Sequence, residues 1–516
     1  MIRSIKLSLK DLLGKEYMEG VVENAVLFLG LKKNEALKLA AEKVEFYPGD
    51  YEKRADNLIK SIGTRVCKSL YKTASGAATD SFNKATNLKA APLGGFAFFR
   101  IGEDGRLYLI SKSEHYHASL GHNFPGYRLL QIAGMLGITN ITHNNTRGFI
   151  TRRLEEELIR TVNGLKKNDI KDVEKIRISG DKHILSRVLN LETGSLAVEA
   201  GIKMMLSRFY RLDKKSDVPI NAGKTPVFLV MGDNEGGKNS NYHGTTIFAQ
   251  MMRGMWPKMH EKAVKAGVSL TIPVSINDIK DFKKKFKKYN TGKYMIAGFL
   301  HEIIMMNYGG IKLKQNYLKK VYKICHKNNV PVLVDEIQSC IWYPGMYLFK
   351  LYGLHPDFVA IGKGFPGGQY PASKIIMTKE MDTLNQFGAL VTNGQEELAS
   401  LAYLITMAFA EANAPHINEI GKYYEKSLRK MAEKYKGIVN MIEGRELLSS
   451  ICFKTAEQAA KFAELLAAEG IDISAQTYKA NCPPAALTKL PIISTKKMVK
   501  YLICKMESAF MRMKTE

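Results

Sequence analysis

Two charged residues follow apolar segments of the sequence in a way that predicts covalent chemistry. Residues 330–334 (VPVLV) are followed by Asp335, and residues 358–361 (FVAI) by a lysine between two glycines, Lys363. Because the carboxyl ends of neighbouring parallel strands meet at one edge of a sheet, we expect both side chains there. Burying an ammonium group is costly, and a Schiff base with a carbonyl cofactor relieves that cost. Asp335 would then keep a pyridine nitrogen of the cofactor protonated.

The sequence around these residues resembles the class III aminotransferase family. The family signature has an apolar strand that ends in Asp-Glu-x-Gln, an aromatic stretch that contains glycine, and a lysine beside glycine. In this chain it corresponds to Asp335, Glu336 and Gln338, to residues 343–349 (YPGMYLF), and to Lys363. The resemblance implies pyridoxal 5'-phosphate as the cofactor, with Asp335 at its ring nitrogen, Gln338 at its phenolic oxygen and Lys363 at its aldehyde carbon.

Further motifs follow in the order of that family. Residues 120–125 (LGHNFP) are similar to the stretch near the start of the family's large domain. By the same resemblance, Thr392 reaches the phosphate bound by a partner subunit, which implies a homodimer. The remaining implied cofactor contacts are a phosphate-binding helix start at Gly194 and Ser195, a stacking ring and its neighbour at Tyr242 and His243, and a strand-end acid at Glu302.

The chain departs from the family pattern near the phosphate and near the substrate. Leu196 stands where an acid usually follows the phosphate loop, and NGQEEL follows Thr392 in place of Gly-Asn-Pro. Residues 485–495 (AALTKLPIIST) contain no arginine where many relatives bind a substrate carboxylate. Lys489 is nearby, but an ammonium lacks the forked geometry that matches a carboxylate. The sequence therefore leaves the identity of the substrate open.

Short apolar runs alternate with helical patterns from residue 226 onward, which is typical of an α/β fold. This alternation predicts a mainly parallel sheet covered by helices. The resemblance adds fold type I, with a seven-stranded type of sheet and helices on both faces. We expect a helical extension at residues 1–90, a large cofactor-binding domain at 91–392 and a small α+β domain at 393–516. The apolar runs are residues 226–231, 269–274, 294–300, 330–335, 357–361 and 373–378.

Composition favours a folded protein without a membrane span. The chain has 516 residues, 45% of them hydrophobic, and a formal net charge of +26. Its longest apolar stretches are much shorter than the roughly 20 residues that cross a bilayer. Residues 278–289, rich in lysine, keep apolar residues at helical spacing, which indicates a solvated helix face rather than a nucleic-acid site. No leader peptide is recognised and the cysteines show no metal-ligand spacing, so we expect a cytoplasmic protein without a metal.

Transamination is the predicted reaction. It would transfer an amino group from an amine or amino acid to a keto acid through a Schiff base at Lys363, whose freed amine then moves a proton. An amino-acid racemase, epimerase or aminomutase of the same family remains an alternative, because these reactions differ in where the proton returns.

A different class of protein, a P-loop nucleotide hydrolase, is suggested by the GxxxxGK spacing at residues 232–238. Asp335 and Glu336 would then be the acidic end of its second strand. Asn239 stands where a serine or threonine hydroxyl should bind magnesium, which counts against this reading.

Overall fold

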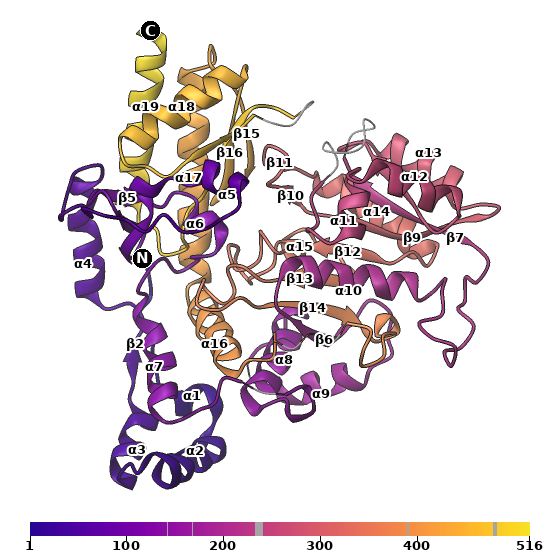
Figure 1. Ribbon diagram of the computed structural model, residues 1–516, viewed down its shortest axis with the longest axis horizontal. Helices are drawn as coiled ribbons and strands as arrows, with labels where there is room; N and C mark the ends of the chain where they lie inside the picture. Colours follow the sequence, from indigo (N-terminus) through magenta and orange to yellow (C-terminus); the bar gives the residue numbers. More distant parts are fainter. Residues whose placement is uncertain are drawn as a thin grey trace.

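The molecule has a large α/β part beside a smaller part that combines segments from both ends of the chain (Figure 1). The computed structural model describes residues 1–141, 143–167, 169–232, 241–389, 391, 393–477 and 482–515. The fold statements that follow concern these residues.

A seven-stranded sheet forms the centre of the large part. Its strand order is β6-β14-β13-β12-β9-β7-β8, and within it β14 alone runs antiparallel to its neighbours. The predicted α/β fold with a mainly parallel, seven-stranded sheet is thus confirmed. The strands are β6 (Leu185–Leu191), β7 (Thr225–Met231), β8 (Leu270–Val274), β9 (Tyr294–His301), β12 (Val332–Asp335), β13 (Phe358–Ile361) and β14 (Ser373–Thr378).

Helices cover both faces of this sheet. Successive side chains of a strand point to opposite faces, and in β12 Val332 and Val334 pack into one hydrophobic cluster whereas Leu333 packs into another. The first cluster includes Leu318 of α14 (Gln315–Lys327), and the second includes Ile202 of α10 (Gly194–Leu206). Burial on both faces explains why these strands are continuous apolar runs in the sequence.

Further helices complete the large part. Helix α8 packs against β6, and α13 packs against β8 and β9. A two-stranded ladder of β10 (Ile304–Met305) and β11 (Ile311–Lys312) follows β9. The helices are α7 (Arg128–Met135), α8 (Phe149–Val162), α9 (Ile170–Ile178), α11 (Ile247–Met252), α12 (Pro257–Lys265), α13 (Ile279–Tyr289) and α15 (Leu348–Leu351).

The N-terminal residues form helices joined by a short two-stranded ladder, β1 (Lys6–Leu7) with β2 (Val44–Glu45). A three-stranded antiparallel sheet follows, made of β3 (Pro92–Phe96), β4 (Phe99–Gly102) and β5 (Leu107–Leu109), and then the short helix α6 (Ser113–Tyr116). The helices before this sheet are α1 (Leu9–Leu13), α2 (Lys15–Leu29), α3 (Lys33–Ala41), α4 (Gly49–Leu58) and α5 (Asp80–Ala85).

The C-terminal residues form the predicted small α+β unit, a four-stranded antiparallel sheet with four helices. The backbone of Leu109 exchanges hydrogen bonds with Gly470 (2.8 Å) and Asp472 (2.9 Å), so β5 lies beside this unit. Its strands are β15 (Val439–Arg445), β16 (Leu448–Phe453), β17 (Ser474–Gln476) and β18 (Ala485–Lys489). Its helices are α16 (Glu397–Ala412), α17 (Ala414–Lys434), α18 (Ala456–Ala468) and α19 (Lys496–Thr515).

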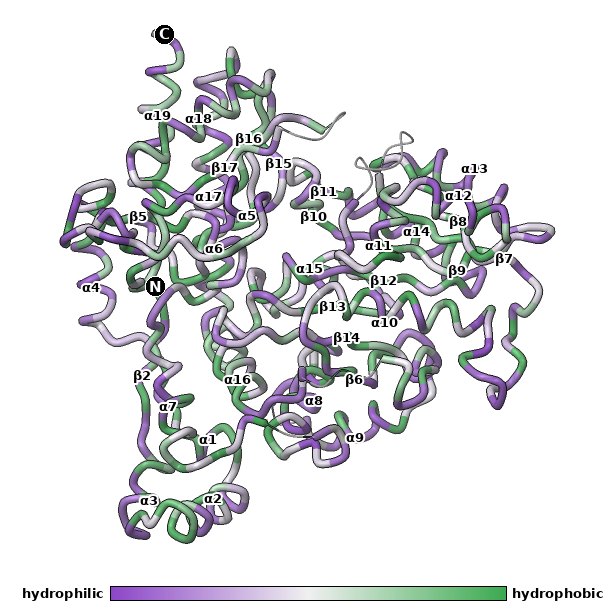
Figure 2. Tube along the Cα trace, in the orientation of Figure 1, coloured by the Kyte–Doolittle hydropathy of each residue, from purple (hydrophilic) through white to green (hydrophobic). Residues whose placement is uncertain are grey.

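The lysine-rich segment is helix α13, which Figure 2 shows as mostly hydrophilic. Phe282 and Phe286 are buried on one side of it, as the helical spacing predicted. Helix α16, by contrast, is mostly hydrophobic in Figure 2 and is buried along nearly its whole length. None of the described helices is both long and apolar enough for a membrane crossing.

Shortening Leu333 to alanine is expected to destabilise the large sheet. The Leu333 side chain is fully buried, and a cavity left by Leu→Ala typically costs about 2–5 kcal/mol of unfolding free energy. Urea unfolding followed by circular dichroism measures this. The control Ile220→Ala changes a side chain that is 71% exposed and should leave the midpoint unchanged; equal midpoints for both variants would contradict the prediction.

Candidate active site

A cavity of about 260 Å³ lies at the carboxyl ends of β12 and β13. The structure brings eight of the nine predicted site residues to its lining, although they are spread over 170 positions of the sequence. The ninth, Thr392, lies outside the described residues. A second hollow, of about 650 Å³, shares His117 and Tyr370 with the cavity and adjoins it. The eight residues are Gly194, Ser195, Tyr242, His243, Glu302, Asp335, Gln338 and Lys363.

Lys363 follows β13 directly and projects its amine into the cavity, 5.3 Å from the centre of the Tyr116 ring. Its backbone has a φ of 41°, which is uncommon for a residue other than glycine. Burial lowers the pKa of the Lys363 amine, while the carboxylates of Glu302 and Asp335 act in the opposite direction. A lower pKa raises the fraction of neutral amine, which is the nucleophilic form.

The glycines beside this lysine are required by close packing. A Cβ at Gly364 would lie 1.9 Å from the Trp342 ring, and one at Gly362 would lie 2.2 Å from Ser373 Oγ. Both distances are far below van der Waals contact. The motif that identified Lys363 in the sequence thus also has a steric reason in the structure.

Asp335 is held in place on both of its oxygens. Its Oδ1 accepts a hydrogen bond from the Ile337 backbone N–H at 3.1 Å, and its Oδ2 lies 3.0 Å from His243 Nδ1. Asn241 Nδ2 contacts His243 Nε2 at 3.3 Å. If the amide donates there, the imidazole carries its proton on Nδ1 and donates it to Asp335. His243 therefore orients the carboxylate, a contact that the sequence did not predict.

The start of α10 provides groups for an anion. Gly194 and Ser195 are the first residues of this helix, and Thr193 caps it by accepting a hydrogen bond from Leu196 N–H at 3.4 Å. Ser195 Oγ accepts a hydrogen bond from Thr245 N–H at 3.1 Å. The free N–H groups and dipole of a helix start favour a phosphate.

Gln338 and Lys489 meet behind the cavity. The side-chain oxygen of Gln338 is buried and has no hydrogen-bond partner among the described residues. Its backbone oxygen accepts a hydrogen bond from the amine of Lys489, which lies 3.7 Å from the centre of the Trp342 ring and 5.0 Å from that of Tyr116. Burial lowers the pKa of Lys489 well below its usual range, and the charge of Lys363 adds to this.

Lys489 therefore does not replace the missing arginine as a group exposed in the cavity. It is fully buried and is not part of the cavity lining. The burial of Lys489 could have been predicted from the sequence, because Lys489 ends a strand whose other residues are apolar or small. The role of Tyr116, between the two lysines, had no comparable signal in the sequence.

The groups that line the cavity fit pyridoxal phosphate. An amine, a fixed carboxylate, a helix start and an aromatic ring are gathered in one space, which Gln338 also lines. These match the carbonyl carbon, the ring nitrogen, the phosphate and the ring face of that cofactor.

The P-loop alternative has little support from the described residues. Residues 233–238 of its proposed loop lie outside them. Glu336, its proposed acid, is buried and accepts hydrogen bonds from Ser339 Oγ (2.5 Å) and from the backbone of Leu348 (3.1 Å) and Phe349 (2.6 Å). Burial raises its pKa to about 7. Glu336 thus anchors the start of α15 rather than a magnesium ion.

Comparison with known proteins supports the same conclusion. A family model described as aminotransferase class-III matches residues 101–484. The chain is 26% identical to the acetylornithine aminotransferase of Aquifex aeolicus over 357 residues, which are 66% of this chain and 80% of that protein. It is 26% identical to the ornithine aminotransferase of Emericella nidulans over 275 residues, 51% of this chain and 56% of that protein.

Solved structures show the same fold. The ornithine aminotransferase of Toxoplasma gondii ME49 superposes with a TM-score of 0.64 at 17% identity, covering 86% of this chain and 93% of that one. The N-acetylornithine aminotransferase of Stenotrophomonas maltophilia K279a gives a TM-score of 0.61 at 17% identity, covering 85% and 100%. A further structure of the Toxoplasma enzyme has pyridoxal phosphate at its active site in partial occupancy.

The chain belongs to the class-III aminotransferase family. The predicted family, fold type and class of enzyme, an aminotransferase, are thereby confirmed, and pyridoxal phosphate is the cofactor that goes with them. The aligned segment covers 63% and 56% of the length of two curated relatives, so membership of the family does not by itself fix the substrates.

Replacing Gly244 by alanine is expected to weaken cofactor binding. Gly244 has a φ of 123°, and a Cβ there would lie 2.8 Å from Ser195 Cα, so the start of α10 must shift. We expect the dissociation constant for pyridoxal phosphate to rise about tenfold or more, a change of about 1.4 kcal/mol. Fluorescence titration of the cofactor-free protein measures this.

Gly223→Ala is a matched control for this variant. Its φ of 79° is also positive, but nothing lies within 4 Å of the added Cβ. Equal cofactor affinities for the two variants would contradict the prediction, because only Gly244→Ala presses on Ser195.

Proposed function

We propose that Lys363 forms the covalent link to pyridoxal phosphate and moves the proton during transamination. The observation that carries this proposal is the position of its amine, buried in the same cavity as Asp335 and the start of α10. The amino donor is an amine or amino acid, and the acceptor is a keto acid.

Each residue of the cavity then has a defined task. When bound, pyridoxal phosphate supplies a carbonyl group for a substrate amine and a ring that accepts electron density. Asp335, fixed by His243, keeps a proton on the ring nitrogen. The N–H groups at Gly194 and Ser195 bind the phosphate, and the Tyr242 ring packs against the pyridine.

Lys363 acts twice in this scheme. As a neutral amine it makes the covalent link, and once a substrate amine has displaced it, Nζ takes a proton from the substrate carbon that carries nitrogen. For transamination, Nζ would deliver that proton to the former aldehyde carbon of the cofactor and not back to the substrate carbon, which is what separates this reaction from racemisation. Gln338 supports this arrangement by presenting its side-chain amide toward the phenolic oxygen of the cofactor.

The substrate class follows from the relatives and from the cavity lining. Two relatives are named for ornithine and acetylornithine, and these amino acids are the first donors that we propose. No arginine is present among the described residues that line the cavity. A substrate carboxylate would therefore need a cation from elsewhere, and a donor that lacks one is a second candidate.

We also propose that the protein is a cytoplasmic homodimer. Leu27 and Phe28 on α2 are 74% and 77% exposed, and a subunit interface would cover them. Thr392 would then contribute to the phosphate site of the partner, as the resemblance implies. The six cysteines are free thiols, which is typical of a reducing compartment.

Replacement of Lys363 by alanine tests the proposed function. The wild-type protein should retain pyridoxal phosphate through borohydride reduction, with the label on the peptide that contains Lys363. With ornithine, acetylornithine or a simple primary amine as the donor, it should also convert 2-oxoglutarate to glutamate, while the donor becomes a keto acid, an aldehyde or a ketone. Lys363→Ala should lose the label and reduce the rate by at least about a thousandfold, because nucleophile and proton carrier are removed together.

Lys379→Ala, which changes an exposed lysine, is the control and should behave as the wild type. A label that persists in Lys363→Ala would refute the assignment of the lysine. Loss of the donor's α-proton, or inversion of its configuration, without transfer of its amino group to 2-oxoglutarate would instead favour the racemase or mutase alternative.

A further inference from the structure

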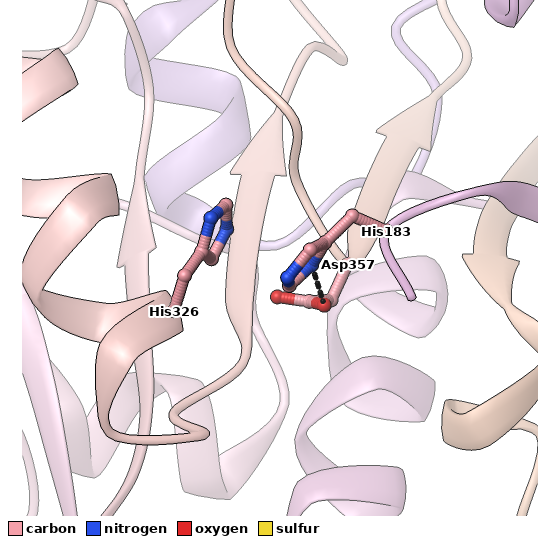
Figure 3. Close-up of side chains that lie close together, drawn as sticks. All are labelled: His183, His326 and Asp357. Carbon is pink, nitrogen blue, oxygen red and sulfur yellow. Dashed lines mark hydrogen bonds and ion pairs between the residues drawn. The ribbon is translucent and has the colours of Figure 1, made fainter. Parts of the chain in front are cut away.

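A cluster of two histidines and an aspartate lies at the edge of the large sheet opposite the cavity (Figure 3). His183 lies in the turn before β6, His326 in the last turn of α14, and Asp357 directly before β13. Lys363 follows the other end of β13. Strand β13 lies between Asp357 and Lys363, and none of the three cluster residues lines the cavity, so the cluster is separate from the cavity.

The three side chains converge. The imidazole rings of His183 and His326 are stacked, with centroids 3.8 Å apart and planes inclined by 22°. His183 Nδ1 lies 3.0 Å from Asp357 Oδ1. One ligand atom from each residue lies within 4.8 Å of the others. In tetrahedral zinc sites with bonds of about 2.0–2.1 Å, ligand atoms are about 3.4 Å apart, so the two imidazole rings would rotate out of their stack to direct these atoms at one ion.

One nitrogen of the cluster lacks a partner. His326 Nε2 is buried and makes no hydrogen bond to any described residue, whereas buried polar atoms are normally satisfied. The carboxylate of Asp357, in contrast, is already oriented, because its Oδ2 accepts a hydrogen bond from Val332 N–H at 2.8 Å. This hydrogen bond leaves Oδ1 of Asp357 facing the imidazoles. Contacts of this kind, from groups that do not touch the metal, orient the ligands of metal sites.

We propose that His183, His326 and Asp357 bind one divalent transition-metal ion of the zinc class. Two imidazole nitrogens and one carboxylate oxygen suit Zn²⁺ or Co²⁺, whereas Mg²⁺ and Ca²⁺ prefer oxygen ligands. Water completes the coordination. The ion would join the amino ends of β6 and β13 to the end of α14, and its role is structural because the chemistry takes place at the opposite edge.

Metal titration of the full-length holoenzyme tests the site. The protein is first treated with a chelator and freed of unbound pyridoxal phosphate, and then Zn²⁺ is titrated in competition with a chromophoric chelator. We expect one equivalent to bind with micromolar or tighter affinity and to raise the thermal midpoint. Co²⁺ in the same site should give visible absorption bands typical of nitrogen and oxygen ligands. Absence of a stoichiometric wild-type site overturns the proposal.

Variants then assign the ligands. His183→Asn combined with His326→Asn should weaken Zn²⁺ binding at least about a hundredfold, since the metal would keep only Asp357 of its three protein ligands. Unchanged visible absorbance of the bound cofactor would show that the variant is folded. His260→Asn is the matched control, because His260 Nε2 is also buried without a hydrogen-bond partner among the residues that the structure describes but is not part of the cluster. Binding that persists in the double variant, or is lost in the control, places the metal elsewhere and refutes the site.

Discussion

The amine of Lys363 is buried in a space that it shares with two carboxylates and an aromatic ring. The other groups of the site surround this buried amine. Removal of an ammonium group from water favours the neutral form, whereas Glu302 and Asp335 favour the charged form. Burial is the larger of these effects, so the pKa of the Lys363 amine lies below its ordinary value. A lowered pKa suits a residue that first forms a covalent bond and later carries a proton.

The second element of the site is a carboxylate whose orientation is fixed before any ligand arrives. Asp335 is bound by a backbone N–H and by His243, and His243 is in turn contacted by Asn241. Asn241 and His243 lie in the segment that follows β7, whereas Asp335 ends β12, and only the sheet brings the two together. Such preorganisation removes the need to reorder the carboxylate at the moment of reaction.

The short strand β13 has functional groups at both of its ends. Its carboxyl end leads to Lys363 and the cofactor cavity, and its amino end begins at Asp357 with the proposed metal ligands. Parallel strands place all their carboxyl ends at one edge, which separates the two sets of groups. The residues that would stabilise the amino edge of the sheet are therefore different from those that carry the chemistry at its carboxyl edge.

The sequence by itself determined the family, and it marked the proposed cofactor lysine and eight of the residues that line the cavity. These residues directly follow apolar strands or begin a helix, so a local pattern of apolar runs, glycines and charges was enough to mark Lys363, Asp335 and Gly194. The mainly parallel sheet, although not its strand order, was likewise visible as alternation of strand and helix patterns, because strands buried on both faces must be continuously apolar.

Only the tertiary structure decided which distant side chains touch. The pairing of His243 with Asp335, the burial of Lys489 behind Gln338, and the meeting of His183, His326 and Asp357 all join residues that are far apart in the chain. Their contacts depend on strand order and on the side from which helices pack. A one-dimensional pattern holds no record of these choices, since hydrophobic burial fixes which residues lie inside but not which polar groups meet there.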